Sequence, residues 1–75
     1  MLILYGTDGC HLCHEAELLL QRAQSARSLA WHTVDIALDP ALFDRYGTRI
    51  PVLVANDVEL DWPFTLLDIL QLTGQ

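Results

Sequence analysis

The chain has no lysine, only two cysteines and one methionine, and no hydrophobic run long enough to span a bilayer. Its four basic residues are scattered arginines, and ten acidic residues bring the formal net charge to −6. Surfaces that bind nucleic acids or anionic membranes need the opposite sign of charge. We therefore expect no nucleic-acid partner and no membrane partner.

The beginning of the sequence lacks the basic segment, the long apolar stretch and the small-residue cleavage site of a secretory signal. We therefore expect a cytoplasmic protein. The length of 75 residues predicts one domain, residues 1–75. Hydrophobic residues make up 52% of the chain and charged residues 19%, a balance that predicts a dense core instead of a disordered chain. We expect a monomer.

Hydrophobic spacing changes along the chain between the patterns of strands and helices. The resulting order, strand, helix, strand, helix, strand, strand, helix, predicts an α/β domain. Two parallel strands and an antiparallel hairpin would form a four-stranded mixed sheet flanked by helices. The predicted elements are strand Leu2–Tyr5, a helix from about Cys10 to Ser25–Ser28, strand Leu29–Ile36, a helix from Asp39-Pro40 to Gly47 with Leu42, Phe43 and Tyr46 on its apolar side, strand Val52–Ala55, a turn at Asn56-Asp57, strand Val58–Leu60, and a helix that Pro63 opens and Gly74 follows.

The two cysteines, Cys10 and Cys13, lie three residues apart at the start of the first predicted helix. A disulfide across so short a gap removes little unfolded-chain entropy, which argues against a structural role. At the first turn of a helix, Cys10 would face unpaired N–H groups and the positive end of the helix dipole, and both favour the thiolate. We predict that Cys10 is the attacking sulfur and that Cys13, expected to be more buried, is the resolving sulfur.

His11 and His14 are the candidates for modulating the thiolate of Cys10. His14 lies four residues after Cys10, so a charged imidazole there would support a negative sulfur, and His11 is adjacent and expected to be more exposed. Asp8 and the net negative charge of the chain act in the opposite direction. The alternative, that both histidines are simply solvated residues of the first turn, stays open.

Metal binding is the main competing chemistry for the same segment. The residues Cys10 to His14 match the C-x-x-C-H pattern of covalent haem attachment. Met1 is the only methionine, so the usual methionine axial ligand is missing, and no second cysteine or histidine cluster follows that would complete a zinc site. The sequence therefore favours no resident metal, and the thiol chemistry requires no organic cofactor.

Nearly the whole chain resembles the glutaredoxin branch of the thioredoxin superfamily, particularly the short bacterial glutaredoxin-like domains. The resemblance implies a thioredoxin-like fold and a thiol–disulfide oxidoreductase of cell redox homeostasis. It also implies protein or glutathione disulfides as partners, with glutathione as a co-substrate or a reductase as the source of electrons. It is carried by Leu4-Tyr5 leading through Gly9 to Cys10-His11-Leu12-Cys13, Val34-Asp35-Ile36 with Asp39-Pro40, Tyr46-Gly47, and Ile50-Pro51-Val52-Leu53.

The resemblance also assigns roles to the segment that precedes the third strand. It implies that Pro51 is a cis-proline lying against the active-site cysteine and that the backbone of Ile50 pairs with the bound thiol substrate. Arg49 is the nearest cation for a substrate carboxylate, and solvated arginines are the common alternative. A plain proline at the start of a strand is the alternative for Pro51.

Three segments depart from the glutaredoxin pattern. His11 and Leu12 stand where a proline and an aromatic residue are typical, and Asp8-Gly9 replaces a basic residue before the first cysteine. Residues 60–63 lack the glycine pair that usually helps to hold glutathione, although Asp61 is acidic. Two alternative functions therefore stay open: a thioredoxin-fold peptide-binding module without turnover, and a glutathione-linked iron–sulfur or metal-binding glutaredoxin-like protein.

Overall fold

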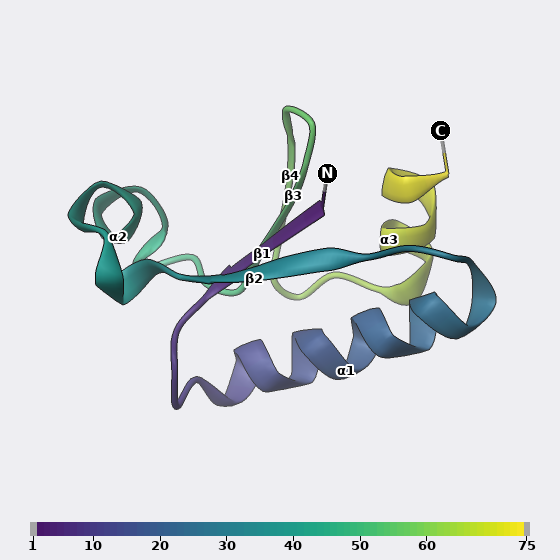
Figure 1. Ribbon diagram of the computed structural model, residues 1–75, viewed down its shortest axis with the longest axis horizontal. Helices are drawn as coiled ribbons and strands as arrows, with labels where there is room; N and C mark the ends of the chain where they lie inside the picture. The colour runs from purple at the N-terminus through teal and green to yellow at the C-terminus, as the bar shows by residue number, and fades with distance from the viewer. Residues whose placement is uncertain (1, 75) are drawn as a thin grey trace.

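The structure, a computed structural model, describes residues 2–74. Its strands and helices follow the predicted order, with one additional 3₁₀ turn (Figure 1). The elements are β1 (Leu2–Gly6), α1 (His11–Ala26), β2 (Trp31–Asp35), the 3₁₀ turn η1 (Ile36–Leu38), α2 (Pro40–Tyr46), β3 (Val52–Ala55), β4 (Val58–Asp61) and α3 (Leu66–Thr73).

The strands form one four-stranded sheet in the order β2-β1-β3-β4. β1 and β2 are parallel, whereas β3 is antiparallel to both β1 and β4. This mixed sheet with its helices confirms the predicted α/β, thioredoxin-like fold. Tyr5 pairs with Val34 on one side and with Val52 on the other, so β1 and β2 end, and β3 begins, at the same edge of the sheet.

Side chains that alternate along β1 pack against different helices. Leu2 and Leu4 belong to the larger core, which also holds buried residues of α1 and α3. Tyr5 packs against a smaller cluster around Tyr46 of α2, and the two tyrosine rings stack with their centroids 4.5 Å apart. The sheet therefore carries α1 and α3 on one face and α2 on the other.

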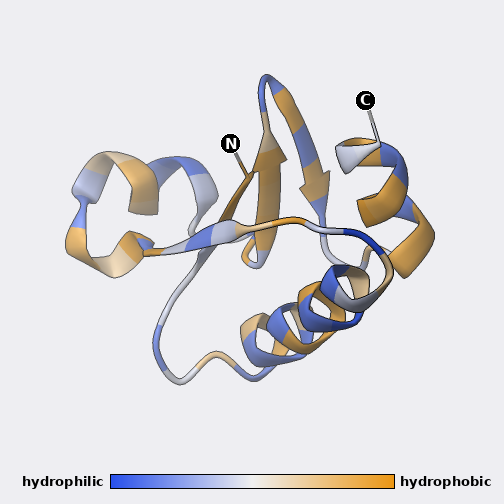
Figure 2. Ribbon diagram, turned by 45° about the vertical axis from the view of Figure 1, so that its right-hand side comes forward, coloured by the Kyte–Doolittle hydropathy of each residue, from blue (hydrophilic) through white to orange (hydrophobic). Residues whose placement is uncertain are grey.

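The helix α1 is amphipathic, as Figure 2 shows by its alternating hydrophilic and hydrophobic bands. Its buried residues recur at helical spacing on the side that faces the sheet: Cys13, Ala16, Leu20 and Ala23. Within residues 2–74, no helix is both long enough and apolar enough to cross a membrane.

The start of the last helix differs from the prediction. The sequence places it at Pro63, but α3 begins at Leu66, with Thr65 as its N-cap. The Thr65 hydroxyl accepts a hydrogen bond from the Asp68 N–H at 3.1 Å, and the Asp68 carboxylate accepts one from the Thr65 N–H at 2.9 Å. This reciprocal capping box satisfies two helix donors, which a proline at the first position does not do.

Two further expectations about the middle of the chain are wrong. The second strand does not continue to Ile36, because the Asp35 carboxylate accepts a hydrogen bond from the Ala37 N–H at 2.9 Å and starts the turn η1. Phe43 does not join the apolar side of α2, since 59% of it is exposed to solvent. The predicted limits of α2, Asp39 as the N-cap and Gly47 as the C-cap, are confirmed.

Candidate functional site

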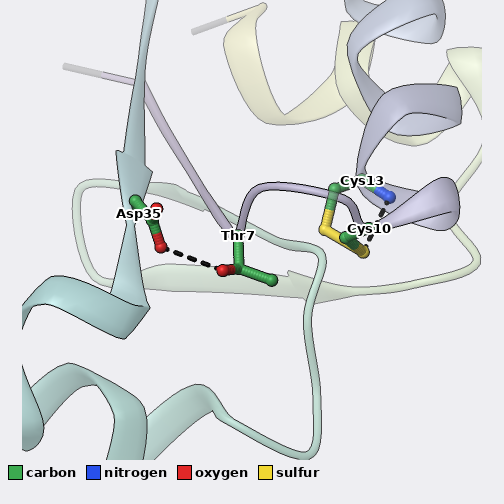
Figure 3. Close-up of a disulfide and its surroundings, with 4 residues drawn as sticks. All are labelled: Thr7, Cys10, Cys13 and Asp35. Atoms are coloured by element: carbon green, nitrogen blue, oxygen red, sulfur yellow. Dashed lines mark hydrogen bonds between the residues drawn. A yellow bond between two sulfur atoms is a disulfide. The ribbon is translucent and has the colours of Figure 1, made fainter.

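Cys10 and Cys13 form a disulfide at the N-terminus of α1, with their Cα atoms 5.2 Å apart. Cys10 is the N-cap residue, and its Sγ accepts a hydrogen bond from the Cys13 N–H at 3.2 Å (Figure 3). The Cys10 carbonyl accepts from the His14 N–H at 3.1 Å. The sulfur of Cys10 therefore occupies the position of a capping acceptor, where it meets a helix donor and the positive end of the helix dipole.

The two sulfurs differ in burial. Cys13 is only 7% exposed and faces the sheet, whereas Cys10 is partly exposed, as the sequence predicts. Gly6 lies directly beneath the inner sulfur, because a Cβ atom at Gly6 would be 2.9 Å from the Cys13 Sγ and 3.2 Å from its Cβ. The last residue of β1 thus has to be small for Cys13 to pack here.

The loop between β1 and α1 is anchored to the end of β2. The Thr7 hydroxyl donates to the Asp35 Oδ1 at 3.0 Å (Figure 3), and the same oxygen accepts from the Ala37 N–H. Gly9 has a φ of +75°, a left-handed conformation that glycine adopts without steric cost. The hydrogen bonds and the conformation of Gly9 therefore hold the β1–α1 loop in place and position Cys10 at the N-terminus of α1.

An open cavity of about 550 Å³ adjoins the disulfide. It lies between the β1–α1 loop, the first two turns of α1 and the end of β2, and both cysteines line it. Three carboxyl side chains, Asp8, Glu17 and Asp35, also line it. A small thiol or a short segment of a peptide fits a cavity of this size beside the sulfurs.

The structure brings both candidate histidines to this cavity. The Nε2 of His11 lies 3.0 Å from the Oε2 of Glu15, one helical turn further on, and the His11 side chain is 85% exposed. His14 is also exposed. The spacing of four residues on a helix is the sequence signal that indicates the pairing of His11 with Glu15. An effect of either histidine on the Cys10 thiolate stays a prediction.

Ile50 and Pro51 precede β3 at the same sheet edge from which the β1–α1 loop departs. The peptide bond between them is cis, and Pro51 is fully buried. The Ile50 N–H donates to the Tyr46 carbonyl at 3.1 Å, so it is already used within the chain. Neither residue lines the cavity beside the disulfide.

Arg49 makes contacts within the protein that its sequence pattern does not predict. Its guanidinium lies 2.6 Å from the Glu59 Oε1 and 2.8 Å from the Asp61 Oδ1, both on β4. The hydrogen bonds that Arg49 donates to these carboxylates raise the pKa of Arg49, and the bond from Arg49 lowers the pKa of Glu59. The Arg49 side chain thus ties the segment before Ile50 to β4. Its predicted role as a partner of a substrate carboxylate stays a prediction.

Glu59 also connects this ion pair to α2. It accepts a hydrogen bond from the Tyr46 hydroxyl at 3.2 Å and pairs with Arg45 at 3.3 Å. Burial raises the pKa of Tyr46, and the Glu59 carboxylate raises it further. The network thus joins α2 and Arg49 to β4 through residues that lie ten or more positions apart in the sequence.

Within residues 2–74, no group of three or more histidine, cysteine, aspartate or glutamate side chains has the arrangement of a metal site.

The chain is similar to one described protein family and to several solved structures. The Glutaredoxin-like domain (DUF836) family matches residues 1–73. The X-ray structure of protein XcR50 from X. campestris is 43% identical, covers 92% of this chain and 89% of its own, and superposes with a TM-score of 0.81. Protein Ne2328 from Nitrosomonas europaea, solved by NMR, is 33% identical, with coverage of 93% and 85% and a TM-score of 0.78.

A structure described as a malarial protein has a TM-score of 0.69 at 15% identity, over 97% of this chain and 91% of its own, and so shows the fold alone. No curated protein matches the chain.

Proposed function

Since the chain belongs to the glutaredoxin-like domain family, we propose that it is a thiol–disulfide oxidoreductase of cell redox homeostasis. In this proposal Cys10 and Cys13 cycle between a dithiol and a disulfide. The observation that carries it is the disulfide itself, which joins the N-cap of α1 to a buried residue of its first turn and opens on a cavity. A disulfide with a purely structural role does not need a cavity beside it.

The reaction needs two unequal sulfurs. In the reduced protein the Cys10 thiolate attacks a substrate disulfide, and one substrate sulfur leaves as a thiolate that takes a proton from water. Cys13 then loses its proton and attacks the Cys10 sulfur, which forms the internal disulfide and expels the second substrate thiol. Two electrons pass to the substrate, and a thiol reductant returns them to the protein.

The positions of the cysteines support this division of roles. Cys10 is more exposed than Cys13, and the Cys13 N–H and the helix dipole favour a negative charge on its sulfur. Cys13 is shielded from foreign thiols but remains within reach of Cys10. The outer sulfur is therefore suited to attack and the inner sulfur to resolution.

The substrate would lie across Cys10 towards the Ile50-Pro51 segment. Because the Ile50 N–H is occupied by Tyr46, the Ile50 carbonyl is the backbone group that we assign to substrate pairing. The partners are protein or glutathione disulfides, with glutathione or a reductase as the reductant, and a reducing cytoplasm suits the cycle. No resident cofactor is needed for it.

Equilibrium in glutathione buffers tests the proposal. The protein is incubated over a range of ratios of reduced to oxidised glutathione, free thiols are trapped, and intact masses are recorded. We expect a Cys10–Cys13 disulfide that forms and disappears reversibly over the range of cytosolic glutathione potentials, roughly −220 to −320 mV. Thiols that stay reduced at every ratio would contradict the proposal and favour a binding module, and thiols blocked by metal would favour the metal alternative.

A further inference from the structure

The cavity beside the disulfide has an unbalanced charge. Asp8 of the β1–α1 loop, Glu17 of α1 and Asp35 at the end of β2 each place a carboxyl side chain in its lining. No arginine lines it, and the chain has no lysine. Because the carboxyl groups come from three different elements, negative charge surrounds the opening beside Cys10 on several sides.

The basic side chains near the cavity do not offset this charge. His11 and His14 are the basic residues in the lining, and His11 already faces Glu15. Of the arginines, Arg45 and Arg49 pair with carboxylates on β4. The Arg27 guanidinium donates to the Leu70 carbonyl at 2.8 Å, near the other end of α1. Arg22 of α1 is exposed and does not line the cavity. No arginine among the described residues therefore lies in the lining to pair with an anionic substrate.

Asp35 is held in place by the fold. Its Oδ1 accepts from the Thr7 hydroxyl (Figure 3) and from the Ala37 N–H, whereas its Oδ2 has no hydrogen-bond partner within residues 2–74. A carboxylate that is fixed through one oxygen presents the other to a ligand without first losing side-chain entropy. A cationic group in the cavity would meet a carboxylate that the fold already holds in place.

We infer that the protein selects disulfides that carry ammonium or guanidinium groups close to their sulfur atoms. Such a group would enter the cavity between Glu17 and Asp35 while Cys10 attacks the neighbouring sulfur. Carboxylate-bearing disulfides, including oxidised glutathione, are disfavoured by the same charges. The inference rests on the proposed function, because it names the substrate class of that reaction.

Three small disulfides of similar length separate charge from size. Cystamine carries two ammonium groups, bis(2-hydroxyethyl) disulfide is neutral, and 3,3′-dithiodipropionate carries two carboxylates. The protein is reduced with a dithiol, freed of it, and mixed with each disulfide under anaerobic conditions. Each molecule of protein then supplies the two electrons that reduce one disulfide to two thiols, and the rate is read from quenched intact masses.

The expected result is a second-order rate constant at least about tenfold higher for cystamine than for the neutral compound, and lower again for the dicarboxylate. The rates are divided by those of each disulfide with a free small thiol, which removes differences in intrinsic reactivity. The preference should shrink several-fold in about 0.5 M salt, which screens exposed charges.

Two double variants test whether the preference for cystamine depends on the carboxyl groups of the cavity. Glu17→Gln with Asp35→Asn removes two charges from the cavity, and asparagine keeps an oxygen for the bonds from Thr7 and Ala37. Asp44→Asn with Asp57→Asn removes two exposed charges, one from α2 and one from the β3–β4 turn, and neither residue lines the cavity. Both variants change the formal net charge from −6 by the same amount, so only the position of the lost charge differs.

The cavity variant should lose most of the cystamine preference, and the matched control should keep it. Glu17→Gln alone should lose part of the cystamine preference. This partial loss can be measured even if the double variant does not fold. Equal rates for all three disulfides, or equal losses in the two double variants, would overturn the inference but leave the proposed function intact. A protein that reacts with none of the three, the neutral compound included, would contradict the proposed function itself.

Discussion

Replacing Cys13 with serine is expected to stop turnover and to leave the substrate thiol bound covalently to Cys10. The serine hydroxyl cannot displace a mixed disulfide, so the reaction halts after its first step. Multiple-turnover reduction of bis(2-hydroxyethyl) disulfide should fall by about two orders of magnitude or more, on the scale typical for loss of a residue that acts on the reacting atoms. Intact mass should show one adduct per molecule, and digestion should locate it at Cys10.

Cys10→Ser is the matched control, since it also removes one sulfur and prevents the internal disulfide. It should form little adduct, because the remaining Cys13 is only 7% exposed and lies against Gly6. Equal adduct formation in the two variants would contradict the assignment of Cys10 as the attacking sulfur. A Cys13→Ser variant that binds extended peptides but traps no thiol would favour the peptide-binding alternative.

Gly6→Ala should destabilise the oxidised protein more than the reduced protein. The new Cβ would lie 2.9 Å from the Cys13 Sγ, which the disulfide to Cys10 prevents from rotating away. Overpacking of this kind costs about 1 to 3 kcal/mol. In the dithiol the Cys13 side chain is free to turn, and alanine regains up to about 1 kcal/mol of backbone entropy.

The difference between the two redox states is the measured quantity. A differential cost of about 1.4 kcal/mol corresponds to a reduction potential about 30 mV less negative, because strain in the oxidised form favours its reduction. Chemical unfolding of both forms and a redox titration of the variant should agree on this difference. In a background that carries Cys10→Ser and Cys13→Ser, the same alanine should cost much less. An unchanged reduction potential would contradict this prediction. It would mean that β1 and α1 move apart and leave the disulfide without strain.

Most of the fold was predictable because its signals are local. The apolar run Leu2–Tyr5 and the helical spacing after Cys10 each specify an element without distant partners. The turn at Asn56-Asp57 is equally local, and Asn56 adopts the expected left-handed conformation with φ of 55°. The late start of α3 also has a local signal, since Thr65 and Asp68 have capping-box spacing, but the proline at position 63 is a competing helix-start signal.

The surroundings of the cysteines were less predictable because they depend on contacts between distant residues. Thr7 and Asp35 are 28 positions apart, and only the parallel pairing of β1 and β2 brings their side chains together. Arg49 reaches Glu59 and Asp61 only once β3 and β4 have paired in their register. The two cysteines and the charged residues near them could be listed from the sequence, but whether a nearby charge faces a substrate or another side chain depends on the tertiary structure.

The most direct test of the central claim is the electron stoichiometry of one turnover. Reduced protein, freed of reductant, is mixed anaerobically with one equivalent of bis(2-hydroxyethyl) disulfide, and the small thiol released is counted beside the intact mass of the protein. The account predicts two thiols released for each protein molecule that reacts, together with a protein mass that has lost two hydrogens and carries no adduct. One thiol with a stable adduct, or no thiol with both cysteines still reduced, would contradict it.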